Sequence, residues 1–207
     1  MSSRIREVTV SIKDLSLGYT SKKKQKVVAS GLTCNIFSGE LTCLVGANGV
    51  GKSTLLRTLS AFQPKLGGRI EIQQTDIDDY TEKELAQVIS VVLTERFAIK
   101  NMTARDLIRL GRSPCTGFWG MLSKEDNRII DQAIQLVKIE KLEHRLIDTL
   151  SDGERQKCLI AKALVQDTPI ILLDEPTAFL DFPSKVELMQ LLHRLSRETS
   201  KTIFLST

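Results

Sequence analysis

The sequence predicts an α/β fold built on a mainly parallel sheet, with an N-terminal antiparallel β lead-in and an inserted α-helical subdomain. The first observation is at residues 46–53, which read Gly-Ala-Asn-Gly-Val-Gly-Lys-Ser and match the pattern G-x-x-x-x-G-K-[ST] between an apolar run at 41–45 and helical apolar spacing at 53–59. The second is the continuous apolar run at 170–173, which is typical of a central parallel strand covered on both faces. The third is a change to mostly helical signals between residues 96 and 149.

The glycine-rich loop predicts a site for a nucleoside triphosphate. Its glycines allow backbone N–H groups to turn inward around phosphate oxygens, and the following helix adds its positive N-terminal end. Lys52 supplies a charge that attracts one phosphate charge by on the order of 4 kcal/mol at about 4 Å in an effective dielectric of about 20, and the Ser53 hydroxyl is expected to ligate Mg²⁺. A glycine-rich turn that binds nothing is the alternative. The predicted nucleotide-binding residues of this segment are Gly46, Ala47, Asn48, Gly49, Val50, Gly51, Lys52, Ser53 and Thr54.

Composition predicts one globular domain, or a domain with a subdomain, because 42% of the 207 residues are hydrophobic and 26% are charged. The net charge of +4 is compatible with a nucleotide, a nucleic acid or an anionic membrane surface and selects none of them. No apolar run reaches the roughly 18 residues of a membrane span, and the start has no signal-peptide core, so a cytosolic chain is expected. The four cysteines show no C-x-x-C spacing, which argues against a zinc or disulfide framework and predicts reduced packing residues.

Two strand-like stretches precede the loop. Residues 8–17 and 31–37 flank a lysine-rich turn at 22–26 and predict a short antiparallel hairpin. The basic run is interpreted as the solvated tip of this hairpin, because few aromatic residues accompany it as they would in a nucleic-acid patch. Tyr19 lies on the lead-in, where its position suits either stacking on an adenine base or ordinary packing on the core.

Turn and cap signals mark the elements after the loop. Gly67-Gly68 predicts a turn before a strand at 69–73. The capping box at residues 81–84 predicts a short helix, which is followed by a β-prone run at 88–93. These elements complete the first part of the α/β core.

The inserted helical subdomain carries two cap signals of its own. Thr103 with Asp106, and Ser123 with Asp126, are placed to cap its helices. The aromatic pair at 118–119 lies between those helices and is either a partner contact or part of the subdomain core.

Two later segments carry chemistry. Ser151 is placed either as a simple N-cap or as part of a second helix N-terminus that accepts a phosphate, with Gly153 allowing close approach. Asp174 and Glu175 follow the buried strand and point toward the crevice where α/β sheets bind ligands. Asp174 is expected to hold the Mg²⁺ shell and Glu175 to orient or deprotonate the attacking water. Capping of the next helix is their alternative role, which Pro176 weakens.

From Tyr19 to the final strand, the chain resembles the ATPase subunits of ABC transporters. Four motifs carry the resemblance in the family's order: Walker A at 46–53, the Leu-Ser-Gly-Gly-Gln signature at 150–154, Walker B at 170–175 and the D-loop at 178–181. The residues around the motifs are similar to those of the importer branch that handles iron-siderophore, haem and cobalamin complexes. The segments that suggest this branch are 111–114, 150–156 and 173–181.

The resemblance implies a P-loop NTPase of RecA-like fold and a single nucleotide-binding domain over residues 1–207. Residues 1–95 and 167–207 would form the catalytic core, and 96–166 the helical and signature subdomain. ATP would be the substrate and Mg²⁺ the cofactor, in a homodimer or pseudo-symmetric dimer whose copies pair head to tail across each ATP. Hydrolysis would drive import through integral membrane permease subunits at the cytoplasmic face of the bacterial inner (plasma) membrane, with no specific nucleic acid as partner.

Residue roles follow from the resemblance. The implied roles are catalysis for Lys52 and Glu175, adenine stacking for Tyr19, contact with the partner copy's ATP for Ser151, Asp152, Gly153 and Glu154, the D-loop for Asp181, and metal contacts for Ser53, Asp174 and Glu95. Asp152 and Glu154 replace the family's glycine and glutamine and add negative charge unless they point away from the phosphate. Glu95 stands at the position of the Q-loop glutamine, where metal contact is altered or lost.

Two other functions stay open. The chain ends at residues 206–207, just before the position of the family's switch histidine, so we expect a C-terminally truncated cassette, which favours nucleotide binding over hydrolysis. A truncated chain that binds nucleotide without turnover is therefore one alternative. The mild basicity suggests the other, a soluble ABC-type ATPase that acts on nucleic acid, ribosomes or cofactor assembly.

Overall fold

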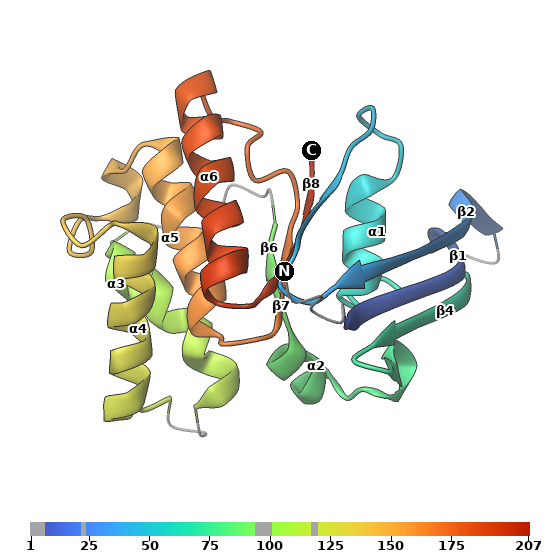
Figure 1. Cartoon of the computed structure of the whole chain (residues 1–207), viewed down its shortest axis with the longest axis horizontal. Coiled ribbons are helices and arrows are strands. Elements are labelled where there is room, and N and C mark those ends of the chain that lie inside the picture. Colours follow the sequence, from blue (N-terminus) through green and yellow to red (C-terminus); the bar gives the residue numbers. More distant parts are fainter. Residues whose placement is uncertain (1–6, 22–23, 94–100, 117–119) are drawn as a thin grey trace, which may run out of the picture.

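The structure, a computed structural model, has an α/β architecture, as predicted. It describes residues 7–21, 24–93, 101–116 and 120–207. Two sheets lie on either side of helix α1 (Lys52–Leu59), and the longest helices cover the far face of one sheet (Figure 1). The positions of Glu95, Phe118 and Trp119 fall outside the described residues.

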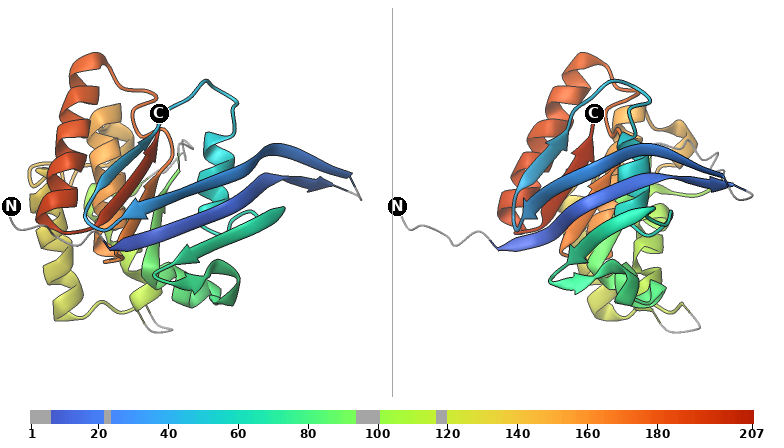
Figure 2. Two further views of the ribbon diagram at one scale, coloured as in Figure 1. Left: turned by 45° about the vertical axis from the view of Figure 1, so that its right-hand side comes forward. Right: turned by 90° about the vertical axis from the view of Figure 1, so that its right-hand side faces the viewer.

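The antiparallel sheet has the strand order β2-β1-β4-β5. Its strands are β1 (Val8–Ser21), β2 (Lys24–Phe37), β4 (Gly67–Ile72) and β5 (Thr75–Asp76). β1 and β2 form a hairpin that is longer than predicted and projects beyond the rest of the molecule (Figure 2). Buried side chains of β1, including Ile12 and Leu15, pack in one apolar cluster with Leu56 and Leu59 of α1, so this sheet covers the helix.

The turn predicted at Gly67-Gly68 is wrong, because both glycines belong to β4. Gly67 pairs with Ser16 next to an irregularity in the register between β1 and β4. Gly68 has φ 81, and a Cβ there would lie 2.3 Å from the carbonyl oxygen of Asp14. The glycine pair therefore serves the close approach of two strands at a bulge.

The parallel sheet has the order β3-β8-β7-β6. Its strands are β3 (Leu41–Leu44), β8 (Thr202–Ser206), β7 (Ile170–Leu173) and β6 (Ile89–Val92). Ile170 and Leu172 pack in the cluster that contains α1, while Ile171 and Leu173 pack in the cluster of the large helices. Both faces of β7 are thus covered, as its unbroken apolar run predicts.

The remaining α-helices begin with side-chain caps, and all of these except the cap of the last helix were predicted from the sequence. They are α2 (Glu82–Val88), α3 (Ala104–Arg109), α4 (Lys124–Val137), α5 (Asp152–Val165) and α6 (Phe182–Glu198), with 3-10 turns η1 (Ile77–Asp79), η2 (Leu110–Cys115) and η3 (Ile147–Thr149). Capping boxes stand at Thr81, Thr103, Ser123 and Ser151, and the side chain of Asp181 caps α6.

A buried ion pair and a hydrogen bond connect η2, α4 and the end of α5 on the helical side of the molecule. Arg112 of η2 donates to Asp126 Oδ1 of α4 at 2.7 Å and to the carbonyl oxygen of Val165 at the end of α5, also at 2.7 Å. These bonds join three elements that the sequence assigns to the inserted subdomain, whose limits at 96–166 stay a prediction. In the part of the chain that the structure describes, no helix is both long and apolar enough to cross a bilayer.

The cysteines only partly fulfil the expectation of packing residues. Cys158 is buried in α5, and burial raises the pKa of its thiol to about 12. Cys34, Cys43 and Cys115 are exposed, so the packing role is wrong for these three.

Candidate functional site

The glycine-rich loop joins β3 to α1 at the carboxyl edge of the parallel sheet. Gly49 and Gly51 have φ values of 80 and 110, which L side chains rarely adopt. A Cβ at Gly51 would also lie 2.6 Å from Cγ1 of Val28 on β2. Gly51 is the N-cap of α1, and no side chain caps this helix. The first N–H groups of α1 therefore have no side-chain oxygen as a partner at the cap.

Lys52 lies folded into the loop that precedes it. Only 5% of the residue is exposed. Its Nζ donates to the carbonyl oxygens of Gly46 at 2.7 Å and Ala47 at 3.2 Å, and it lies 3.7 Å from Oε1 of Glu175. The loop thus places a buried cation beside a carboxylate from a different strand. Residues 46–53 and Glu175, predicted separately from the sequence, come together here.

The Ser53 hydroxyl and the Asp174 carboxylate meet at the start of α1. Ser53 Oγ donates to Asp174 Oδ1 at 2.9 Å, although the two residues are 121 positions apart. Hard oxygen donors of this kind suit Mg²⁺, which usually takes one or two protein ligands and completes its shell with phosphates and water. Among the described residues, no group of three or more His, Cys, Asp or Glu residues could hold a metal ion.

Glu175 occupies a constrained turn after β7. Its φ of 44 lies in the left-handed region, which costs a non-glycine residue roughly 1–2 kcal/mol. Its N–H donates to Ser206 Oγ at 2.9 Å, and its carbonyl accepts from the N–H of Ala178 at 3.0 Å. Ser206 was not predicted as a site residue. The signal available in the sequence is a polar residue at the end of an apolar run, and the structure shows that this strand pairs with the strand of the two acids.

Tyr19 lies on β1, next to the first turn of α1. Its hydroxyl is 3.0 Å from Thr54 Oγ1, and 46% of the residue is exposed. The alternative of ordinary packing in the core is therefore wrong. Stacking on a base stays a prediction, and the hydrogen bond fixes the ring at the edge of the loop.

The predicted signature segment forms the start of α5. Ser151 Oγ accepts from the N–H of Glu154 at 3.2 Å, and the Glu154 carboxylate accepts from the N–H of Ser151 at 2.8 Å. The latter bond holds the pKa of Glu154 below its usual value. A Cβ at Gly153 would lie 3.5 Å from Ser184 Oγ of α6, so this glycine faces the neighbouring helix. The Glu154 carboxylate is thus turned back onto its own helix.

Asp181 links the predicted D-loop to α6. Its Oδ1 accepts from the N–H of Ser184 at 3.1 Å, and hydrogen bonding from Ser184 lowers the pKa of the Asp181 carboxyl. The helices α1, α5 and α6 all start at the edge where the parallel strands end (Figure 1). The start of α5 and the phosphate loop lie on opposite sides of α6 and β8 in this view, so one copy of the chain does not bring them together.

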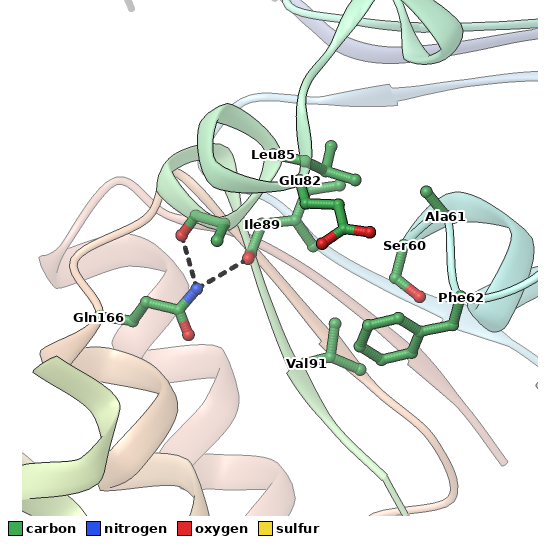
Figure 3. Close-up of a pocket in the computed structure, with 9 residues that line it drawn as sticks. Ser60, Ala61, Phe62, Glu82, Leu85, Ile89, Val91 and Gln166 are labelled. Atoms are coloured by element: carbon green, nitrogen blue, oxygen red, sulfur yellow. Dashed lines mark hydrogen bonds between the residues drawn. The ribbon is translucent and has the colours of Figure 1, made fainter. Parts of the chain in front are cut away.

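A separate hollow of about 400 Å³ lies between α1, α2 and β6. Phe62 is 64% exposed at its rim, and Leu85, Ile89 and Val91 line it (Figure 3). Gln166, the residue after α5, donates through its side-chain amide to the carbonyl oxygens of Ala86 at 2.6 Å and Ile89 at 3.0 Å. The predicted site residues that the structure describes do not line this hollow.

The chain matches a protein family over most of its length. A family model described as ABC transporter matches residues 29–178. An ABC transporter ATP-binding protein of Methanocaldococcus jannaschii is 40% identical over 190 residues, which cover 92% of this chain and 64% of that protein. The ferric enterobactin transport ATP-binding protein FepC of Escherichia coli is 38% identical over 189 residues, which cover 91% of this chain and 68% of FepC. The chain therefore spans about two thirds of the length of these relatives.

A solved structure shares the fold. A metal-chelate type ABC transporter in an inward-facing conformation superposes with a TM-score of 0.82 at 27% identity. The match covers 97% of this chain and 74% of that chain. Similarity thus extends over both sheets and the helical side.

Proposed function

Because the chain belongs to the ABC transporter family, we propose that it is an ATP-binding subunit that binds and hydrolyses MgATP to drive import of a substrate through membrane permease subunits. In this proposal it works head to tail with a second ATPase subunit, on the cytoplasmic face of the membrane. The proposed cargo is a metal-chelate complex of the iron-siderophore, haem or cobalamin type. Similarity to FepC and to the metal-chelate type transporter supports this cargo class.

The observation that carries the proposal is the meeting of two motifs at one edge of the sheet. Lys52 lies 3.7 Å from Glu175, and Ser53 lies 2.9 Å from Asp174. The four residues provide a cation, a carboxylate and two oxygen donors beside backbone N–H groups that no side chain caps. This combination suits a nucleoside triphosphate with Mg²⁺.

Each residue of this cluster has a step in the proposed reaction. On ATP binding, the Lys52 ammonium exchanges its carbonyl contacts in the loop for phosphate oxygens, while Tyr19 covers the base. Ser53 and Asp174 would hold Mg²⁺, which, when bound, neutralises charge that develops on the phosphates. Glu175 orients or deprotonates the water that attacks the terminal phosphate.

A second copy completes the proposed site. The start of α5 is a helix N-terminus, which favours an anion, yet it lies away from the phosphate loop of its own chain. Head-to-tail pairing would place Ser151 and Gly153 of one copy over the ATP held by the other. The Glu154 carboxylate accepts from the N–H of Ser151, so its negative charge is held at the start of α5, within the capping box.

Lys52→Ala tests the nucleotide site. The Mg-ATP dissociation constant, measured by titration calorimetry on the purified protein, should rise at least about 100-fold, since the site loses its only buried cation among the described residues of the loop. Lys13→Ala is the matched control, because Lys13 is an exposed lysine that pairs with Glu71 on the antiparallel sheet. Unchanged affinity in Lys52→Ala, or an equal loss in Lys13→Ala, would contradict the proposal. Co-purification with a polytopic membrane protein, and not with RNA or DNA, distinguishes transport from the soluble alternative.

A further inference from the structure

Ser206, the last residue of β8, joins the two acids of the proposed site. It is 0% exposed. Its hydroxyl donates to Asp174 Oδ1 at 2.8 Å and accepts from the N–H of Glu175 at 2.9 Å. β8 lies between β3 and β7, so this hydroxyl stands between the strand that leads into the phosphate loop and the strand that carries both acids.

We propose that Ser206 is a positioning residue that sets the Asp174 carboxylate for Mg²⁺ and the backbone of Glu175 for the attacking water at the same time. This inference rests on the proposed ATPase function. Ser206 is buried beneath both acids and acts through them, without contact to the nucleotide.

In this proposal, Ser206 first orients the Asp174 carboxylate. Asp174 Oδ1 accepts two hydroxyl groups, from Ser53 at 2.9 Å and from Ser206 at 2.8 Å. The Ser53 hydroxyl is itself an expected metal ligand, whereas Ser206 is a donor that reaches the carboxylate from the sheet. Outer donors of this kind orient metal-binding groups, and their removal commonly lowers metal affinity by about 10- to 100-fold.

The second action is on the backbone of Glu175. At φ 44 this residue adopts a conformation that is unfavourable without glycine, so an outside contact has to hold it. The bond from its N–H to Ser206 Oγ supplies that contact. The side chain that leaves this turn has its Oε1 3.7 Å from Lys52 Nζ.

A buried serine with no role in the site would only form a hydrogen bond that satisfies its own hydroxyl. The same sheet contains such a serine. Ser90 on β6 is also buried, and its Oγ donates to the carbonyl oxygen of Ile170 at 3.5 Å. Both residues lose a buried hydroxyl on substitution by alanine, but only Ser206 contacts the acids of the site. Ser90→Ala is therefore the matched control.

The experiment compares ATP binding with Mg²⁺ and with EDTA, by titration calorimetry, in the parent protein, Ser206→Ala, Ser206→Thr, Ser206→Cys and Ser90→Ala. Ser206→Ala should lower the Mg²⁺-dependent gain in ATP affinity by about tenfold or more and leave binding in EDTA within about twofold of the parent. It should also lower kcat more than it changes KM. Ser206→Thr keeps the hydroxyl and should restore most of the gain, and Ser206→Cys, a weaker donor, should be intermediate. Ser90→Ala should keep the full gain.

The outcomes separate this inference from the function on which it rests. If the parent binds MgATP and Ser206→Ala retains the full Mg²⁺-dependent gain, the positioning role is wrong while the ATPase proposal stands. An equal loss of the gain in Ser90→Ala also overturns it, because the effect would then be one of packing. If the parent binds no ATP with or without Mg²⁺, both proposals fail.

Discussion

The starts of α1 and α5 are two helix N-termini at the same edge of one sheet, and they are built in opposite ways. α1 begins at Gly51 without a side-chain cap. α5 begins with a complete capping box, in which Ser151 and Glu154 satisfy each other's backbone N–H. Among the described α-helices, every one except α1 has a side-chain cap.

This difference indicates which of the two helix N-termini needs a ligand to satisfy its backbone N–H groups. An uncapped helix start keeps its donors and its positive potential for an outside anion, and here a buried lysine adds to it. A capped start already holds an anion, the Glu154 carboxylate, so it is stable before any ligand or partner arrives. The phosphate loop is therefore suited to primary binding, and the start of α5 to a contact made later by a preformed surface.

The largest effect is expected from forcing a side chain into the uncapped terminus. Gly51→Ala places a Cβ 2.6 Å from Val28 at a φ of 110, which distorts the loop. The MgATP affinity should fall by at least about 100-fold, or about 2.7 kcal/mol. Gly120→Ala is the control, because Gly120 also has a positive φ, 62, but a Cβ there meets no atom within 4 Å. Equal MgATP affinities of the two variants in calorimetry would contradict the assignment of primary binding to the uncapped start of α1.

A smaller effect is expected at the capped terminus. Ser151→Ala removes the N-cap of α5 and should lower the free energy of unfolding by about 1 kcal/mol, with MgATP affinity of a single copy unchanged. Ser123→Ala removes the same capping box on α4 and should cost the same stability. ATP turnover should fall by about tenfold or more in Ser151→Ala alone. A similar loss of turnover in Ser123→Ala would show that only helix stability matters.

The smallest effect is expected from Glu154→Gln, because glutamine can also close a capping box. At pH 7 the free energy of unfolding should change by no more than about 0.5 kcal/mol. In the parent, the Ser151 N–H holds the pKa of Glu154 below its usual value, so its contribution is present above about pH 4.3 and is lost as the pH falls through the folded-state pKa. Glu154→Gln should remove that part of the acid destabilisation. Superimposable stability curves from pH 3 to 6 would contradict this account.

Local patterns predicted the elements and most of the candidate site. The caps at Thr81, Thr103 and Ser123 depend on residues three positions apart, so the sequence alone reveals them. The glycine-rich loop was likewise predicted from its local motif, and the acids were predicted because they follow the buried strand β7.

Features that depend on contacts between strands were missed. Ser206 acts across 32 positions of the chain on Asp174, and nothing near it in the sequence indicates that partner. Gly67-Gly68 has the composition of a turn, but pairing with β1 draws it into a strand. The length of the β1–β2 hairpin was also underestimated, because pairing extends into residues with weak strand signals.

The Gln166 amide has a mechanical consequence. It bonds the C-terminal end of α5 to Ala86 of α2 and Ile89 of β6, whereas Ser151 lies at the opposite end of the same helix. A 14-residue helix is about 21 Å long, so a tilt of about 10° around that anchor moves the serine by roughly 3.5 Å. Under the proposed head-to-tail pairing, such a tilt would be large enough to make or break a hydrogen bond between Ser151 and the nucleotide held by a second copy.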